Sequence, residues 1–188
     1  VSKKMHLAST WLTILGATIS AWWILVANSW MQYPTGMEFN PLTARNEMVD
    51  FFAVALSPVA VNKFLHTVIS SWILGSAFVI GISAWYYLKN RDTKFALQSM
   101  KVSAAFGLVA TILTLWTGHG SAVQVAEKQP MKLAVMEGLY EGGENADLIL
   151  FAVPNPSKES YNDGKDAYLF PPITLPGGLS FLAHSNFD

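Results

Sequence analysis

The chain has 188 residues, of which 52% are hydrophobic and only 13% are charged, about half of the roughly 25% that a soluble domain carries. The absence of cysteine excludes disulfides, thiolate metal sites, cysteine nucleophiles and the covalent attachment of c-type haem. A net charge of −1 gives no indication of nucleic-acid binding, so we expect no nucleic-acid partner and a surface that partly faces lipid.

Three long runs without Asp, Glu, Lys or Arg predict three transmembrane helices. Such a helix needs about 20 mostly apolar residues, and the expected spans cover about 7–31, 62–88 and 98–119. Trp and Tyr gather at several of their ends, as they do at membrane interfaces. The alternative, a soluble all-helical protein, leaves three uncharged runs of this length unexplained.

The fold class that we expect is an all-α membrane protein, with three transmembrane helices from a larger helical bundle and an extracytoplasmic loop region. The transmembrane part is residues 1–126, and charges return at ordinary density in residues 127–188. Val1 is not an initiator methionine, and the first span is too long for the core of a signal peptide. We therefore expect the chain to be an internal piece of a larger protein.

Basic residues predict the orientation, because cytoplasmic loops carry an excess of Lys and Arg. Lys3 and Lys4 precede the first span. Four more basic residues crowd the link between the second and third spans: Lys89, Arg91, Lys94 and Lys101. Both places are expected to be cytoplasmic, which puts the first loop and residues 127–188 on the outer side.

The outer region contains signals for short elements. A proline at a favourable first position and a later Gly-Gly pair predict a helix at about 130–141. The segment NADLILFAVPNP, residues 145–156, is predicted to form a strand or extended run, and the turn-rich residues 157–167 a mobile loop. The last apolar stretch, from Tyr168, is broken by prolines, so we expect it to lie against the protein or the interface rather than to span.

His66 lies near the start of the second span and is a candidate haem ligand. A neutral imidazole is a good axial ligand for haem iron, and ionisable groups within spans are usually functional. On a helix, mostly small residues follow His66 on one face, which leaves room for a flat cofactor: Ser70, Leu74, Ala77 and Gly81. Lys63, one turn earlier, is placed to pair with a haem propionate. The alternatives are a histidine that bonds a neighbouring helix or reaches the interface, and a lysine that anchors the helix at the headgroups.

Lys132 and Glu137 form a second pair of candidates in the outer region. Five residues turn an ideal helix by about 500°, so the two side chains point roughly 140° apart and cannot form a simple ion pair. They could reach a bound ligand from different sides, or act through a helix end. The alternative is that both are ordinary solvated residues.

Three blocks of sequence carry a resemblance to a known family. ANSWMQYP at 27–34, PVAVNKFLHTV at 58–68 and GHGSAVQVAEKQPMKLAVMEGLYE at 118–141 closely resemble successive blocks of subunit I of cytochrome bd-type quinol oxidases. The order and spacing of the blocks also match, and the similarity covers nearly the whole chain.

The resemblance implies an electrogenic quinol:O2 oxidoreductase that reduces O2 to water with two b-type haems and one haem d. His66 falls on the position that ligates the low-spin b haem. Lys132 and Glu137 match residues implicated in quinol binding and oxidation. Glu47 matches a recurring acidic position, to which no role can be assigned.

The resemblance also implies that much of the protein lies outside this sequence. The methionine that completes the ligation of the low-spin haem, and the ligands of the second haem b and of haem d, match no position here. The family has about nine spans, of which this chain would hold the fourth to the sixth, so the fragment alone is expected to be inactive. The expected partners are the rest of subunit I, subunit II, small accessory subunits, quinol (ubiquinol or menaquinol), O2 and the lipid bilayer of a bacterial cytoplasmic membrane.

Two other functions remain open at this point. A haem-carrying membrane anchor of another respiratory enzyme typically needs paired histidines within its spans, whereas only His66 lies properly within a span here. A transporter or structural membrane module would have no redox role at all.

Overall fold

The computed structural model describes residues 2–139, 143–156 and 168–184. The chain divides into two units, Val1–Gly118 and His119–Asp188, and each is described by itself. The predicted mobile loop at 157–167 lies outside the described residues.

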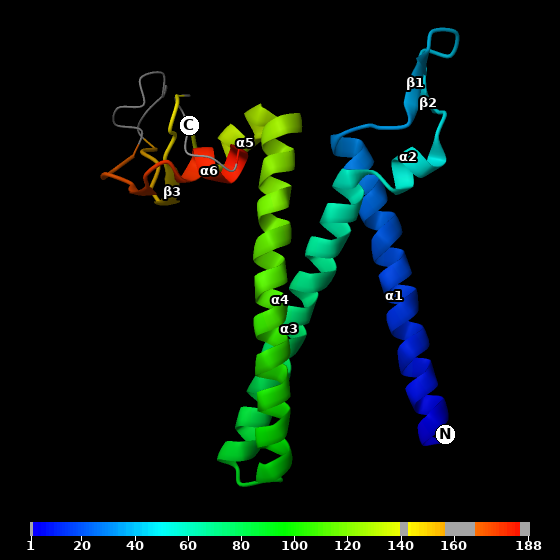
Figure 1. The fold of residues 1–188 in the computed structure, drawn as a ribbon, viewed down its shortest axis with the longest axis vertical. Helices are drawn as coiled ribbons and strands as arrows, with labels where there is room; N and C mark the ends of the chain where they lie inside the picture. The colour runs from blue at the N-terminus through cyan, green and yellow to red at the C-terminus, as the bar shows by residue number, and fades with distance from the viewer. Residues whose placement is uncertain (1, 140–142, 157–167, 185–188) are drawn as a thin grey trace. The chain divides into compact units, whose positions relative to one another are not determined.

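Three long helices make up most of the first unit (Figure 1): α1 (Lys3–Gln32), α3 (Pro58–Leu88) and α4 (Thr93–Lys128), the last of which continues into the second unit. Three segments are long and apolar enough to cross a membrane, by length and composition: Lys3–Gln32, Phe51–Leu88, which contains α3, and Thr93–Lys128. The hydroxyl of Ser2 caps α1, and that of Ser57 caps α3 ahead of a proline at the first helical position.

The large apolar side chains of these helices mostly point outward, as Leu12, Phe78 and Leu108 do with exposed fractions of 69%, 68% and 63%. In water such a surface would be costly, whereas in lipid or against further helices it is favourable. The small core of the unit consists of Val26 of α1, Val54 in the connection between α1 and α3, and Ala60 of α3, with Trp22 and Trp30 packed against them.

Helices α3 and α4 approach each other closely. The hydroxyl of Ser76 donates to the carbonyl of Ser103 at 2.7 Å, and the missing side chain of Gly107 makes room for Ser76. The rings of Trp72 and Phe106 lie 5.7 Å apart on the same pair of helices. Small residues at the contact are typical of helices that pack within a membrane.

Between α1 and α3 the chain forms a hairpin and a short helix that the sequence did not predict. Strands β1 (Met37–Asn40) and β2 (Arg45–Met48) pair antiparallel, and α2 (Phe51–Ala55) follows with Asp50 as its cap. The carboxylate of Glu47 accepts hydrogen bonds from Asn40 Nδ2 at 3.0 Å and Thr43 Oγ1 at 2.8 Å. Glu47 therefore holds the turn of the hairpin closed, which is a structural role for a position that had none.

The second unit contains the end of α4 and four short elements: α5 (Pro130–Met136), β3 (Leu148–Phe151), β4 (Ile173–Leu175) and α6 (Gly178–His184). Strands β3 and β4 pair antiparallel. The core consists of Leu133, Leu179 and Ala183, so α5 and α6 pack on each other. The strand predicted in 145–156 is confirmed as β3, and the expectation that the last apolar stretch lies against the protein is met by α6.

The helix predicted at 130–141 is wrong in its end, because α5 stops at Met136. Gly138 adopts a left-handed conformation with φ +64°, which a glycine reaches without steric cost. Its N–H donates to Val135 O at 3.4 Å, and the N–H of Leu139 donates to Ala134 O at 2.8 Å. This pair of bonds is the Schellman arrangement that ends a helix, so Gly138, rather than the later glycine pair, is the stop.

Candidate functional site

His66 is half-buried on α3, on the side that meets α4. Its ring nitrogen Nδ1 lies 3.0 Å from the hydroxyl oxygen of Thr117, near the end of the first unit. A Cβ built on Gly118 would lie 3.3 Å from Cε1 of the ring, so the backbone of α4 comes close to the imidazole. The other ring nitrogen, Nε2, makes no hydrogen bond to any residue that the structure describes.

Lys63 lies one turn before His66 and is also half-buried. Its ammonium donates to Asn28 Oδ1 of α1 at 3.1 Å, and the same oxygen accepts from Gln32 Nε2 at 3.3 Å. Asn62 reaches the other way and donates to the carbonyl of Thr117 at 3.3 Å. The start of α3 is therefore tied to both α1 and α4, which holds the ring of His66 in place.

The arrangement around His66 fits one axial position of a haem. A histidine that binds haem iron uses one ring nitrogen and holds the other by a hydrogen bond, and Nδ1 of His66 has such a contact with Thr117 Oγ1. Gly81, on the same face of α3, has no atom within 4 Å of an added Cβ, so the face is open there. Among the described residues no cluster of three or more His, Cys, Asp or Glu could hold a metal ion by itself.

Lys132 and Glu137 lie at opposite ends of α5. Lys132 is exposed, whereas Glu137 is half-buried and caps the C-terminal end of the helix, with its N–H bonded to Leu133 O at 2.9 Å. Glu137 lines an open pocket of about 350 Å³ together with residues of β3 and Tyr168, whose hydroxyl donates to Gly138 O at 2.9 Å. Lys132 is not among the residues that line this pocket.

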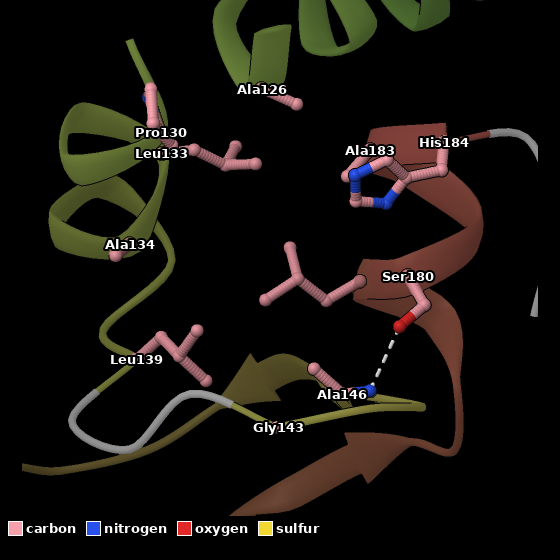
Figure 2. A pocket seen from close by; sticks show the side chains of 11 residues that line it. Ala126, Pro130, Leu133, Ala134, Leu139, Gly143, Ala146, Ser180, Ala183 and His184 are labelled. Atoms are coloured by element: carbon pink, nitrogen blue, oxygen red, sulfur yellow. Dashed lines mark hydrogen bonds between the residues drawn. The ribbon is translucent and has the colours of Figure 1, made fainter. Parts of the chain in front are cut away.

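A second pocket of the same unit, of about 200 Å³, lies between α5 and α6 (Figure 2). It is mostly apolar and is lined by Leu133 and Leu179 of the core and by the imidazole of His184. Ser180 stands at its edge and accepts a hydrogen bond from the N–H of Ala146 at 2.9 Å, drawn as a dashed line. No residue lines both this pocket and the pocket that Glu137 lines.

The electrostatics of Glu47 differ from those of an ordinary surface carboxylate. The hydrogen bond from Asn40 and, second, that from Thr43 lower the pKa of Glu47 below its usual value of 4.5, against a smaller opposing effect of burial. The hydrogen bonds of the hairpin therefore stabilise the ionised form of the Glu47 side chain.

Two residues near these sites were not predicted from the sequence: Thr117, which contacts His66, and His184, which lines the second pocket. Thr117 and His184 carry no local signal, because a hydroxyl and an imidazole gain meaning only from what other helices bring near them. His66 and Thr117 are 51 positions apart, and the rotation of two helices about their axes decides whether they meet.

A comparison with solved structures indicates the class of protein. The fold resembles the structure of bd oxidase from Geobacillus thermodenitrificans, with a TM-score of 0.78 and 24% identity over 99% of this chain and 40% of that chain. This likeness confirms the expected fold class, a helical membrane protein with three spanning helices.

The family follows from the sequence. The family model for cytochrome bd terminal oxidase subunit I matches residues 1–188, and the chain belongs to this family. It is 46% identical to cytochrome bd-II ubiquinol oxidase subunit 1 of Escherichia coli strain K12, over 100% of this chain and 35% of that protein. It is 36% identical to cytochrome bd ubiquinol oxidase subunit 1 of Bacillus subtilis strain 168, over 99% of this chain and 38% of that protein.

The predicted resemblance is thus confirmed, and the chain spans little more than a third of the length of these relatives. Family and helices together indicate a multi-pass protein of the bacterial inner membrane, and the family implies haem cofactors. The predicted roles of His66, Lys63, Lys132 and Glu137, the division at 126 and the orientation stay predictions.

Proposed function

We propose that this chain is part of subunit I of a cytochrome bd-type terminal oxidase, which oxidises membrane quinol and reduces O2 to water. The match of the family to the whole chain carries the proposal. The names of the two relatives give ubiquinol as their substrate, which supports quinol as the substrate class here. The rest of subunit I, subunit II and accessory subunits would supply the parts that this chain lacks.

His66 would hold the low-spin b haem through its Nε2 atom. When bound, the haem supplies a one-electron carrier between quinol and the site of O2 reduction. Lys63 would stand beside the haem and pair with a propionate, which is compatible with its bond to Asn28 because an ammonium has three N–H donors. The second haem b and haem d would be held by residues outside this chain.

Quinol oxidation releases two protons and two electrons for each quinol. Glu137 would accept a hydroxyl proton, as a half-buried carboxylate in an open pocket can. Lys132, exposed on α5, would donate a hydrogen bond to a quinol oxygen. The excess of Lys and Arg in the link after α3 supports an outer location for this region, so the protons would be released outside.

The complete subunit in its complex is the material for the test. A reduced-minus-oxidised visible spectrum should contain both haem b bands and the longer-wavelength band of haem d. A haem-carrying anchor would give b bands alone, and a module without redox function would give no haem signal.

The substitution His66→Ala should abolish the low-spin b band while the assembled protein persists, because it removes the imidazole that would bind the iron. His6→Ala is the matched control, since His6 lies exposed near the start of α1 and should leave every band intact. A low-spin band that survives His66→Ala in the assembled complex contradicts the assignment of His66.

A further inference from the structure

The contact between His66 and Thr117 contains information on which ring nitrogen carries the proton. The two atoms, Nδ1 and Oγ1, lie 3.0 Å apart, and either could be the donor. A neutral imidazole has one N–H and one lone pair, so the direction of this bond decides which nitrogen can bind a metal.

The hydroxyl of Thr117 has a second set of neighbours that decides the direction. Its oxygen lies 3.0 Å from Leu113 O and 3.2 Å from Thr114 O, and carbonyl oxygens only accept. The single hydroxyl proton therefore points back along α4 to these carbonyls. The oxygen of Thr117 then faces His66 with a lone pair. The hydrogen bond between them therefore runs from the N–H at Nδ1 of His66 to Oγ1 of Thr117.

The position of Thr117 is itself fixed from α3. Asn62, one turn before His66, donates to the carbonyl of Thr117 at 3.3 Å. Gly118 brings the backbone of α4 against the edge of the ring, where a Cβ would be 3.3 Å from Cε1 and 3.8 Å from Nδ1. The ring is thus limited both in rotation and in tautomer by the same turn of α4.

We propose that Thr117 is a positioning residue for the haem ligand, which accepts the Nδ1 proton of His66 and so keeps Nε2 as the lone pair for iron. This inference rests on the proposed function, because it needs His66 as the axial ligand. A hydrogen bond that accepts the far N–H of a ligating imidazole makes the imidazole more basic and favours the more highly charged metal. Thr117 therefore stabilises the ferric haem and lowers its midpoint potential.

The test uses the complete oxidase and a redox titration of the low-spin b band. Thr117→Val keeps the shape of the side chain and removes the hydroxyl, so the midpoint potential should shift to a more positive value. Thr117→Ser keeps the hydroxyl and should titrate like the unchanged protein. Thr111→Val is the matched control, because Thr111 makes the same kind of bond to a backbone carbonyl of α4, at 2.8 Å to Gly107 O, and is exposed.

Where Thr117→Val does not assemble, Thr117→Ala removes the same hydroxyl with less bulk beside the ring and should give the same positive shift. An unchanged potential in an assembled variant without the hydroxyl, or an equal shift in Thr117→Ser, overturns the inference and leaves the proposed function intact. A low-spin band that persists in His66→Ala overturns both. A merely structural role for Thr117 would change the amount of assembled protein without moving the potential.

Discussion

Glu137 and Lys132 have different surroundings, so we expect substitutions at the two positions to change the kinetics of quinol oxidation in different ways. Glu137→Gln removes a proton acceptor, and general-base catalysis contributes about 10²–10⁴-fold to a rate. We therefore expect quinol oxidation by the complete enzyme to slow by at least about 100-fold, with all haem bands in place. Lys132→Ala should mainly raise KM for quinol, because it removes a hydrogen bond to the substrate. Steady-state assays with a soluble quinol measure both effects.

Glu144→Gln is the control for these two variants, because Glu144 is an exposed carboxylate of the same unit. Its rate should equal that of the unchanged enzyme. Loss of haem bands in Glu137→Gln or Lys132→Ala would show that the residue supports the structure rather than the chemistry.

The lowered pKa of Glu47 predicts that the stability of the hairpin depends on pH. Its pKa is lowered in the folded state, so the stabilisation is complete above the ordinary value of 4.5 and is lost as the pH falls through the lower, folded-state pKa. Hydrogen exchange of residues 37–48, corrected for intrinsic rates, should be unchanged from neutral pH down to that range. Glu47→Gln should raise exchange in the hairpin already at pH 7, since the carboxylate that accepts from Asn40 and Thr43 is gone.

Glu38→Gln is the matched control for the hairpin. Glu38 pairs directly with Glu47 across the two strands, and like charges in that position repel. Its replacement should leave protection equal or higher. Faster exchange in Glu38→Gln than in Glu47→Gln would contradict the role that the structure gives to Glu47.

At the scale of the elements, the α3–α4 contact depends on the absence of a side chain at Gly107. A Cβ there would overlap the hydroxyl of Ser76 and lie 3.1 Å from its Cβ. Gly107→Ala should therefore push the helices apart and destabilise the complete protein by about 1–3 kcal/mol, as overpacking does. Thermal unfolding in detergent, followed by loss of the haem signal, measures the change.

A second substitution in the same chain tests the cause of that effect. Ser76→Gly removes both atoms that a new Cβ would meet, so the double variant should recover stability relative to Gly107→Ala. Additive destabilisation by the two changes would mean that the two helices do not share this contact.

The spanning elements could be predicted from the sequence, but their ends could not. Hydropathy locates where a helix is apolar, whereas the backbone hydrogen bonds of α4 continue through charged residues as far as Lys128. Strand β1 alternates apolar and polar residues but only over four positions, and β2 does not alternate, so neither strand could be predicted from its pattern. The predicted end of α5 is wrong because Gly138 stops the helix ahead of the Gly-Gly pair.

At the scale of the whole molecule, the family was predictable because its sequence blocks are long and specific, and the comparisons confirm it. His66 was already a candidate from its place within a span, and the resemblance supported it and gave roles to Lys132 and Glu137. Thr117 was not a candidate, because a single sequence contains no information on how two helices are rotated toward each other. The roles of all four are predictions to be tested in the complete complex, and this chain spans little more than a third of the length of its relatives.

The outward-facing apolar side chains of α1, α3 and α4 have a consequence for biogenesis. Each helix satisfies its own backbone hydrogen bonds, so it is stable in a bilayer before it has neighbours. The ribosome could therefore deliver these segments to the membrane one after another, and side-by-side association would follow. Under the roles proposed for His66 and Thr117, haem loading would then wait for the turn of α4 that contains Thr117 to reach α3, so the arrival of α4 would be the earliest moment at which His66 could bind iron.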